Sequence, residues 1–143
     1  MPLLFVYGSL KEGFPNFHFN KGRRMPGEFR TAQPYPFYLA DGALPCLLPR
    51  PGTGHRVMGQ LFEVTAAELA AMDELERVGL PGGYARITIE VALVADAHGT
   101  PGAAGAPTPA FVYVQAEERL HGDGEHIGPI AEYTLEHARA LRW

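Results

Sequence analysis

One carboxylate of this sequence, Glu76, falls on a helical stripe that otherwise carries apolar side chains. Successive residues of a helix are rotated by about 100°, so Leu69, Met72 and Glu76 share one face. A carboxylate held partly out of water has a raised pKa, which suits proton transfer near neutral pH. The spacing therefore predicts a general acid or base at position 76.

The neighbouring charges also indicate that Glu76 points inward. Glu74 and Arg77 fall on the outer side of the same predicted helix, where charged side chains are normally solvated. A structural alternative stays open, because structural ion pairs also perturb carboxylates. The last helical turn could overhang the core, so that Glu76 reaches solvent or pairs with Arg77 or Arg86.

A second candidate is the segment from Tyr7 to Gly13, with the sequence YGSLKEG, which follows a short apolar run. A strand that ends in a Gly-Ser turn can point several backbone N–H groups into one concavity, a site for a carboxylate or a developing oxyanion. The Gly-Lys-Ser/Thr spacing of a phosphate loop is absent. The competing interpretation is an ordinary turn.

Other reactive residues have structural explanations. Cys46 could be a nucleophile, but a lone cysteine between Pro45 and Leu47 is typical of a small buried apolar residue. A polar cluster could bind a divalent ion or form a flexible loop: His121, Asp123, Glu125 and His126. His18 and His55 lie in predicted loops, which favours surface positions. We predict no metal ion and no cofactor.

Composition limits the function classes. The chain has 143 residues, with 16 acidic and 12 basic side chains and a formal net charge of −4. This length supports one domain, residues 1–143, and the mild acidity argues against a nucleic-acid or anionic-membrane partner. The single cysteine and the absence of a signal-peptide pattern predict a cytoplasmic location. No stretch approaches the roughly 20 apolar residues of a membrane span.

The elements that must position these residues are mostly strands, since 17 glycines and 13 prolines disfavour a helical protein. A buried strand is predicted over 3–7. The segment 29–40 has strand-forming residues but contains Pro34 and Pro36, so any strand there lies at an edge or is bulged.

Four later strands follow from apolar runs and alternation. The strands 43–48 and 57–64 flank a Pro-Gly-Thr-Gly turn and are predicted to pair antiparallel if that turn is tight. Alternation is clearest over 84–95, and an apolar strand resumes at 110–116. Between these two, 97–109 is a low-complexity loop of a hairpin.

Two helices complete the expected architecture. Thr65 and Glu68 match a capping box, so a helix should run from about residue 66 to about residue 78, where Gly79 and Pro81 stop it. A second amphipathic helix is predicted over 129–142. Its stripe contains Ile130, Thr134, His137 and Leu141.

Taken together, these segments resemble the gamma-glutamylcyclotransferase family, most closely its small γ-glutamylamine cyclotransferase branch. The resemblance covers most of the chain from Leu4 to about Val94. It rests on an ordered set of motifs: Phe5 to Gly13 with Asn16, Pro45 with Leu47-Leu48, Pro51-Gly52, Val57 with Gly59, Met72-Asp-Glu-Leu-Glu76, and Tyr84-Ala-Arg86.

The resemblance implies an α+β fold, a small mixed β-barrel with flanking helices and a cavity at its mouth. It implies cleavage of a γ-glutamyl amide, a small-molecule substrate, into 5-oxoproline and a free amine. The loop Tyr7, Gly8, Ser9 and Leu10 would hold the γ-glutamyl group, Glu76 would be catalytic, and Tyr113 would face the ligand.

A different function class stays open: a non-catalytic binding module on the same barrel that recognises γ-glutamyl or other small carboxylate ligands. The chain departs from the family pattern in the 97–109 loop and around 121–127. The leaving amine, whether a lysine side chain, a polyamine, an antibiotic intermediate or an amino acid, is therefore left open, as is the oligomeric state.

Overall fold

The computed structural model describes residues 1–40, 44–96, 98, 105–116 and 126–139. Its strands are β1 (Leu3–Val6), β2 (Arg23–Arg24), β3 (Glu28–Thr31), β4 (Phe37–Ala40), β5 (Leu44–Leu47), β6 (Met58–Glu63), β7 (Ala85–Ala95) and β8 (Thr108–Val114). The helices are the 3-10 turn η1 (Phe17–Phe19), α1 (Ala66–Leu75) and α2 (Leu135–Arg139).

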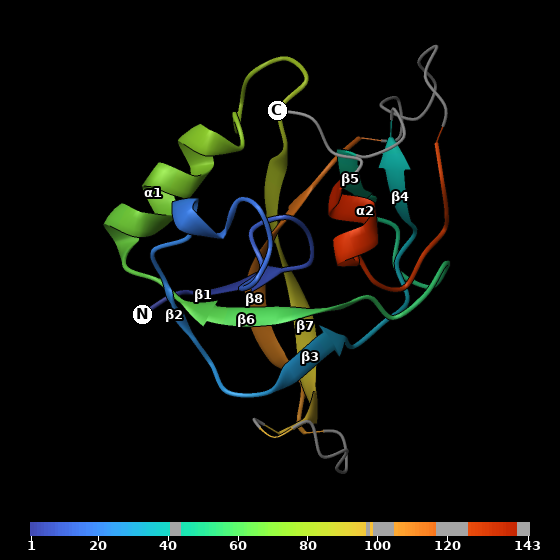
Figure 1. Cartoon of the computed structure of the whole chain (residues 1–143), viewed down its shortest axis with the longest axis horizontal. Helices are drawn as coiled ribbons and strands as arrows, with labels where there is room; N and C mark the ends of the chain where they lie inside the picture. Colours follow the sequence, from blue (N-terminus) through green and yellow to red (C-terminus); the bar gives the residue numbers. More distant parts are fainter. Residues whose placement is uncertain (41–43, 97, 99–104, 117–125, 140–143) are drawn as a thin grey trace.

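Five strands form a closed barrel in which each has two hydrogen-bonded neighbours. The order is β1-β8-β7-β3-β6, and β6 pairs again with β1. The β1–β8 pair is parallel and the other four pairs are antiparallel. Helices α1 and α2 flank the barrel on different sides (Figure 1). The predicted α+β class, a small mixed barrel with flanking helices, is confirmed.

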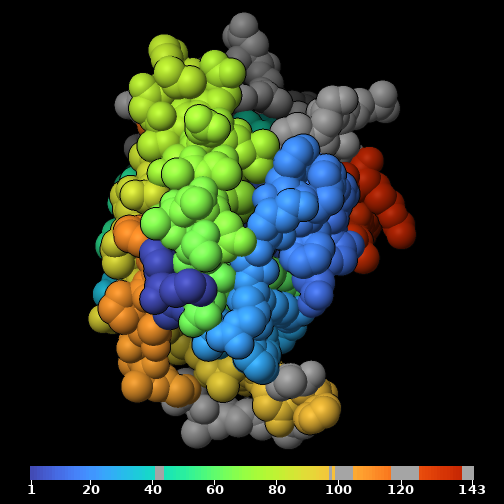
Figure 2. Space-filling model, turned by 90° about the vertical axis from the view of Figure 1, so that its left-hand side faces the viewer, coloured from blue at the N-terminus to red at the C-terminus, as the bar shows by residue number. Residues whose placement is uncertain are grey.

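Alternation along β1 serves two apolar clusters at once. Phe5 belongs to the barrel interior, whereas Leu4 and Val6 belong to a second cluster with Leu69 and Met72 of α1. Side chains on one face of α1 are therefore buried against the outside of the barrel, as the helical spacing predicts. Figure 2 shows α1, in green, beside the blue segment that contains η1.

Helix α1 begins as predicted and ends earlier. Both hydrogen bonds of the capping box are present between Thr65 and Glu68. The helix ends because Arg77 adopts a left-handed φ of 56°. Its N–H donates to the Glu74 carbonyl and the Val78 N–H donates to the Asp73 carbonyl. These two bonds form a Schellman motif, which normally has glycine at this position.

The predicted pairing of the two strands around the 51–54 turn is wrong. β5 pairs with β4 in a separate two-stranded sheet. β6 has no free edge for β5, because β1 occupies one side and β2 and β3 occupy the other. The prolines act as expected: the 29–40 segment splits into β3, which has a register shift after Glu28, and the edge strand β4.

The predicted C-terminal helix begins six residues later than expected, at Leu135. The Ile130 N–H donates to the Phe37 carbonyl of β4, and the Met58 N–H of β6 donates to the Ala131 carbonyl. In a helix that began at residue 129, the Ala131 carbonyl would instead accept from residue 135. Tyr133, outside the predicted stripe, is fully buried. Leu141 lies outside the described residues.

The hairpin of β7 and β8 is confirmed, and most of the 97–109 loop lies outside the described residues. The loop end of the hairpin is marked by the pair Val91 and Thr108, and the opposite end has the pair Arg86 and Tyr113. Five residues of strand, a length of roughly 17 Å, separate these two pairs.

In the described part of the chain no helix is long and apolar enough to cross a membrane. The cytoplasmic location stays a prediction.

Candidate active site

A cavity of about 80 Å³ lies between the end of α1, the loop after β1 and the late strand β8. All the residues that the sequence nominated line it: Tyr7, Gly8, Ser9, Leu10, Glu76 and Tyr113. One water molecule needs about 10–15 Å³ by this measure, so the cavity has room for a small polar ligand group. Residues about 70 and 105 positions apart are thus brought together by barrel closure.

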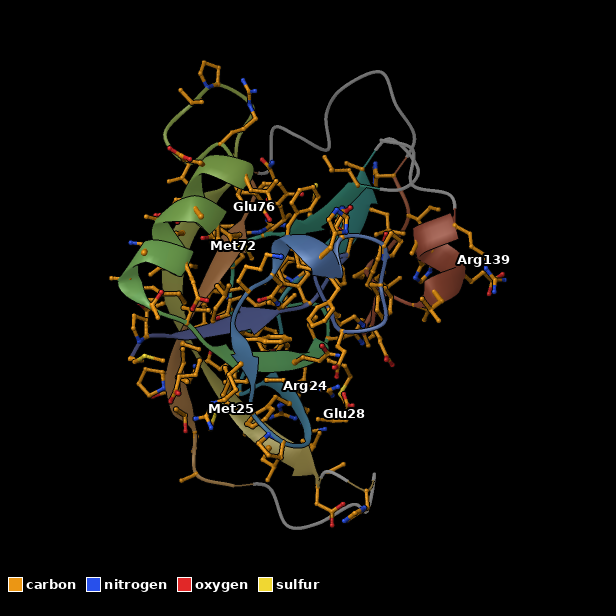
Figure 3. All side chains as sticks on the ribbon, turned by 60° about the vertical axis from the view of Figure 1, so that its left-hand side comes forward. Arg24, Met25, Glu28, Met72, Glu76 and Arg139 are labelled. Atoms are coloured by element: carbon orange, nitrogen blue, oxygen red, sulfur yellow. The ribbon has the colours of Figure 1, made fainter. Side chains whose placement is uncertain are left out.

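Glu76 is the C-cap residue of α1, and its carbonyl accepts a hydrogen bond of 2.9 Å from the Tyr84 N–H. Figure 3 shows Met72 and Glu76 on the side of α1 that faces the barrel. Burial raises the pKa of the Glu76 carboxyl from its ordinary value of 4.5 to about 7, because the charged form loses solvation. Among the described residues, none donates a hydrogen bond to this carboxyl or forms an ion pair with it.

The arginine that could have neutralised Glu76 is bound elsewhere. Arg86 Nη1 lies 2.6 Å from Asp73 Oδ2, and the hydroxyl of Tyr113 donates to Asp73 Oδ1 over 2.7 Å. Arg77 is exposed at the left-handed turn. The structural alternative in which Glu76 pairs with Arg77 or Arg86 is therefore wrong for this structure.

Two asparagines form hydrogen bonds with the loop after β1. Asn16 donates from its backbone N–H to the Ser9 carbonyl and from Nδ2 to Ser9 Oγ, each over 3.0 Å. Asn20 Nδ2 donates to the Leu10 carbonyl over 3.2 Å. None of the described residues accepts a hydrogen bond from the backbone N–H of Gly8, Ser9 or Leu10. These N–H groups remain available to an anionic ligand group.

The hydroxyls of the two predicted tyrosines donate to groups of the protein itself. Tyr7 donates to the Tyr113 carbonyl over 2.6 Å, and its ring meets Phe37 edge-on at 5.0 Å. Burial raises the pKa of Tyr7, and burial together with the Asp73 hydrogen bond raises the pKa of Tyr113. Both residues line the cavity, and their hydroxyls connect β8 to the loop after β1 and to α1.

The sequence analysis did not predict the burial of Lys11, whose side chain is only 4% exposed. Its Nζ donates to the Tyr133 carbonyl over 2.6 Å and lies 4.2 Å from the centre of the Phe14 ring. Burial lowers the pKa of Lys11 from 10.5 to about 8. The side chain therefore fastens the cavity loop to the C-terminal segment. Nothing in a Leu-Lys-Glu sequence indicates this, since lysine is normally exposed.

The remaining reactive residues do not form a second site in the described part of the chain. Cys46 is fully buried in β5, as the apolar interpretation predicts. His126 is exposed, with its ring 5.4 Å from Tyr38, while the other three members of the polar cluster lie outside the described residues. No group of three or more metal-ligating side chains occurs among the described residues. His18 and His55 are exposed, as predicted.

The fold and the cavity define a small closed-barrel protein in which one partly buried carboxyl, that of Glu76, shares a cavity with the loop after β1. The family model for the AIG2-like gamma-glutamyl cyclotransferases matches residues 4–134. The chain belongs to this family, whose enzymes are of the gamma-glutamylcyclotransferase type. The resemblance inferred from the sequence motifs is confirmed.

Individual relatives agree with this assignment. The chain is 39% identical to the gamma-glutamylaminecyclotransferase of Bos taurus over 146 residues, covering 98% of this chain and 80% of the relative. It is 37% identical to the Homo sapiens protein of the same name, covering 81% and 80%. A crystal structure of a Mus musculus AIG2-like protein matches with a TM-score of 0.75 and 29% identity, covering 100% of this chain and 95% of that one. These similarities support a cyclotransferase function.

Proposed function

We propose that this protein is a γ-glutamylamine cyclotransferase that releases 5-oxoproline and a free amine. The observation that carries the proposal is Glu76, a partly buried carboxyl without a partner among the described residues. It lines the same cavity as Gly8, Ser9 and Leu10, whose backbone N–H groups have no acceptor among the described residues. The named relatives support the substrate class, a small molecule with a γ-glutamyl group.

The reaction needs no enzyme nucleophile, because the substrate carries its own. The α-amino nitrogen attacks the γ-carbonyl carbon, a ring C–N bond forms, and the original amide C–N bond breaks to release the amine. Well-oriented intramolecular attack can supply about 7 kcal/mol or more of the barrier. A loop that holds the amino-acid head in one orientation therefore contributes directly to the rate.

Proton transfer is the role proposed for Glu76. Its carboxylate accepts one proton from the α-ammonium group before attack and a second from the ring nitrogen after attack. The carboxylic acid passes each proton to the departing nitrogen, so the amine leaves as an ammonium group and Glu76 ends as a carboxylate. With a pKa of about 7, both forms are accessible near neutral pH. Such a group typically contributes about 10² to 10⁴ in rate. An amide of the Gly8–Leu10 loop would stabilise the oxyanion that forms during attack.

The test is incubation of the protein with γ-glutamyl-ε-lysine or a γ-glutamylalkylamine, followed by mass spectrometry for 5-oxoproline. We expect the wild type and a Glu74→Gln control to release it, since Glu74 is exposed on the same helix. Glu76→Gln should fold and bind but form no product. Substrate binding by the wild type without product would identify a binding module instead, and normal turnover by Glu76→Gln would exclude the assigned role.

A further inference from the structure

Helix α1 carries two carboxylates one turn apart near the cavity, and their surroundings differ. Asp73 and Glu76 are neighbours on the helix surface, because residues three apart have Cβ atoms about 5–6 Å from each other. Asp73 accepts hydrogen bonds from Arg86 and from the Tyr113 hydroxyl. The carboxyl of Glu76 has no such partner among the described residues.

Arg86 lies in the part of the chain that is bonded to the end of α1. It lies two residues after Tyr84, so both side chains point to the same face of the strand. The backbone N–H of Tyr84 is bonded to the Glu76 carbonyl, which sets this part of the strand against the end of α1. If Asp73 did not hold it, the long and flexible side chain of Arg86 would have Glu76 as the neighbouring carboxylate, one helical turn from Asp73.

The remaining titratable groups around Glu76 do not compete for it. The hydroxyls of Tyr7 and Tyr84 donate to the carbonyls of Tyr113 and Pro45, respectively. The Tyr113 hydroxyl donates to Asp73. Cys46 is buried next to Tyr7. Phenols and thiols are neutral near neutral pH, so Asp73 and Arg86 are the charged groups that matter here.

We propose that Asp73 is a positioning residue, which holds the Arg86 guanidinium and the Tyr113 hydroxyl away from Glu76 and balances the arginine charge. The Glu76 carboxyl is thereby left without a cationic partner, the state that a proton carrier in this cavity requires. This inference rests on the proposed function for its significance, while the geometry it describes can be tested without turnover. A purely structural ion pair would fasten α1 to β7 and have no effect on Glu76.

The test compares the titration of the Glu76 carboxyl in four variants of the free, full-length protein. The probe is the ¹³C NMR signal of this carboxyl, assigned by its loss in Glu76→Gln. Asp73→Asn keeps an oxygen that can accept from Tyr113 but presents an amide donor to Arg86, so the arginine is released. Arg86→Met removes the charge and keeps apolar contact with Phe111, whose ring lies 4.7 Å from the guanidinium. The double variant and the matched control Glu74→Gln complete the set.

We expect Asp73→Asn to lower the titration midpoint of Glu76 by roughly 1–3 pH units, the usual effect of an arginine on a carboxylate. The double variant and Glu74→Gln should titrate near pH 7, the pKa of Glu76 in the wild type. Arg86→Met leaves the Asp73 carboxylate unbalanced one turn from Glu76, so its midpoint should lie at or above that of the wild type. The acidic limb of the kcat/KM profile should move with the midpoint. At pH 6 the wild type should retain about one-tenth of its plateau, and Asp73→Asn should retain about half of its own or more.

Two results would overturn the proposal. One is an unchanged Glu76 midpoint in folded Asp73→Asn, or a midpoint in the double variant that matches Asp73→Asn. The other compares the double variant with the wild type: a midpoint well above that of the wild type would mean that the arginine already acts on Glu76 and that Asp73 does not insulate it. Because the titration needs no substrate, a lack of turnover would count against the proposed function alone.

Discussion

Replacing Glu76 with glutamine should stabilise the protein above neutral pH, because the wild type must keep a charge in a poorly solvated place. The pKa of this carboxyl is about 7 in the folded protein, against an ordinary value of 4.5. The folded state therefore binds more protons than the unfolded state between these two values. The contribution of Glu76 to the free energy of unfolding is therefore fully present below about pH 4.5 and is lost as the pH rises through about 7.

The size of the effect follows from the same two pKa values. Each pKa unit corresponds to about 1.4 kcal/mol, so ionisation of Glu76 costs the folded state about 3 kcal/mol once the pH exceeds 8. Glutamine has nearly the same shape and carries no charge. The difference in unfolding free energy between Glu76→Gln and the wild type should therefore grow by about 3 kcal/mol between pH 4 and pH 8.

The assay is urea unfolding of both proteins at closely spaced pH values, followed by circular dichroism. Glu74→Gln is the control, since Glu74 is exposed and its replacement should leave the pH dependence unchanged. A difference between Glu76→Gln and the wild type that stays constant from pH 4 to pH 8 would refute the reasoning. It would mean that the carboxyl is solvated in the folded state.

Three further predictions concern residues around the cavity. The wild type should gain roughly 1 kcal/mol of stability from pH 7 to pH 9, because the folded pKa of Lys11 is about 8 against 10.5, and Lys11→Met should lose this gain in urea titrations. Tyr7→Phe removes the bond to the Tyr113 carbonyl and should cost about 1 kcal/mol in thermal unfolding. Arg77→Gly relieves a left-handed φ of 56°, so it should increase the free energy of unfolding by up to about 1 kcal/mol and raise the melting temperature. A lower melting temperature would argue against the Schellman ending of α1.

Local patterns predicted the elements that depend on neighbouring residues. The alternation of β7 and the capping box at Thr65 and Glu68 are present as expected. The end of α1 was predicted less well, since glycine was expected to stop it and Arg77 does so instead. Pairing was the weakest prediction, because β5 and the segment after Pro129 depend on which strand edges the closed barrel leaves open.

In the candidate site, too, local patterns were predicted and contacts between distant residues were not. Helical spacing identified Glu76 as inward, because Leu69 and Met72 on the same face are buried. The partners of Asp73 and the burial of Lys11 could not be predicted, since both are contacts between residues far apart in the chain. The hydroxyl direction of Tyr113 likewise depends on where α1 lies against β8.

The parallel pairing of β1 with β8 has a consequence for folding. The Tyr7 hydroxyl reaches a carbonyl 106 residues later, and Lys11 reaches one 122 residues later. Contacts of this span require closure of long chain loops before they add stability, and such topologies fold slowly. During synthesis the cavity loop emerges first but can be fastened only after the last strand has been made. The protein therefore acquires its ligand site as a late event of folding, and any unfolding that separates β8 from β1 abolishes it at once.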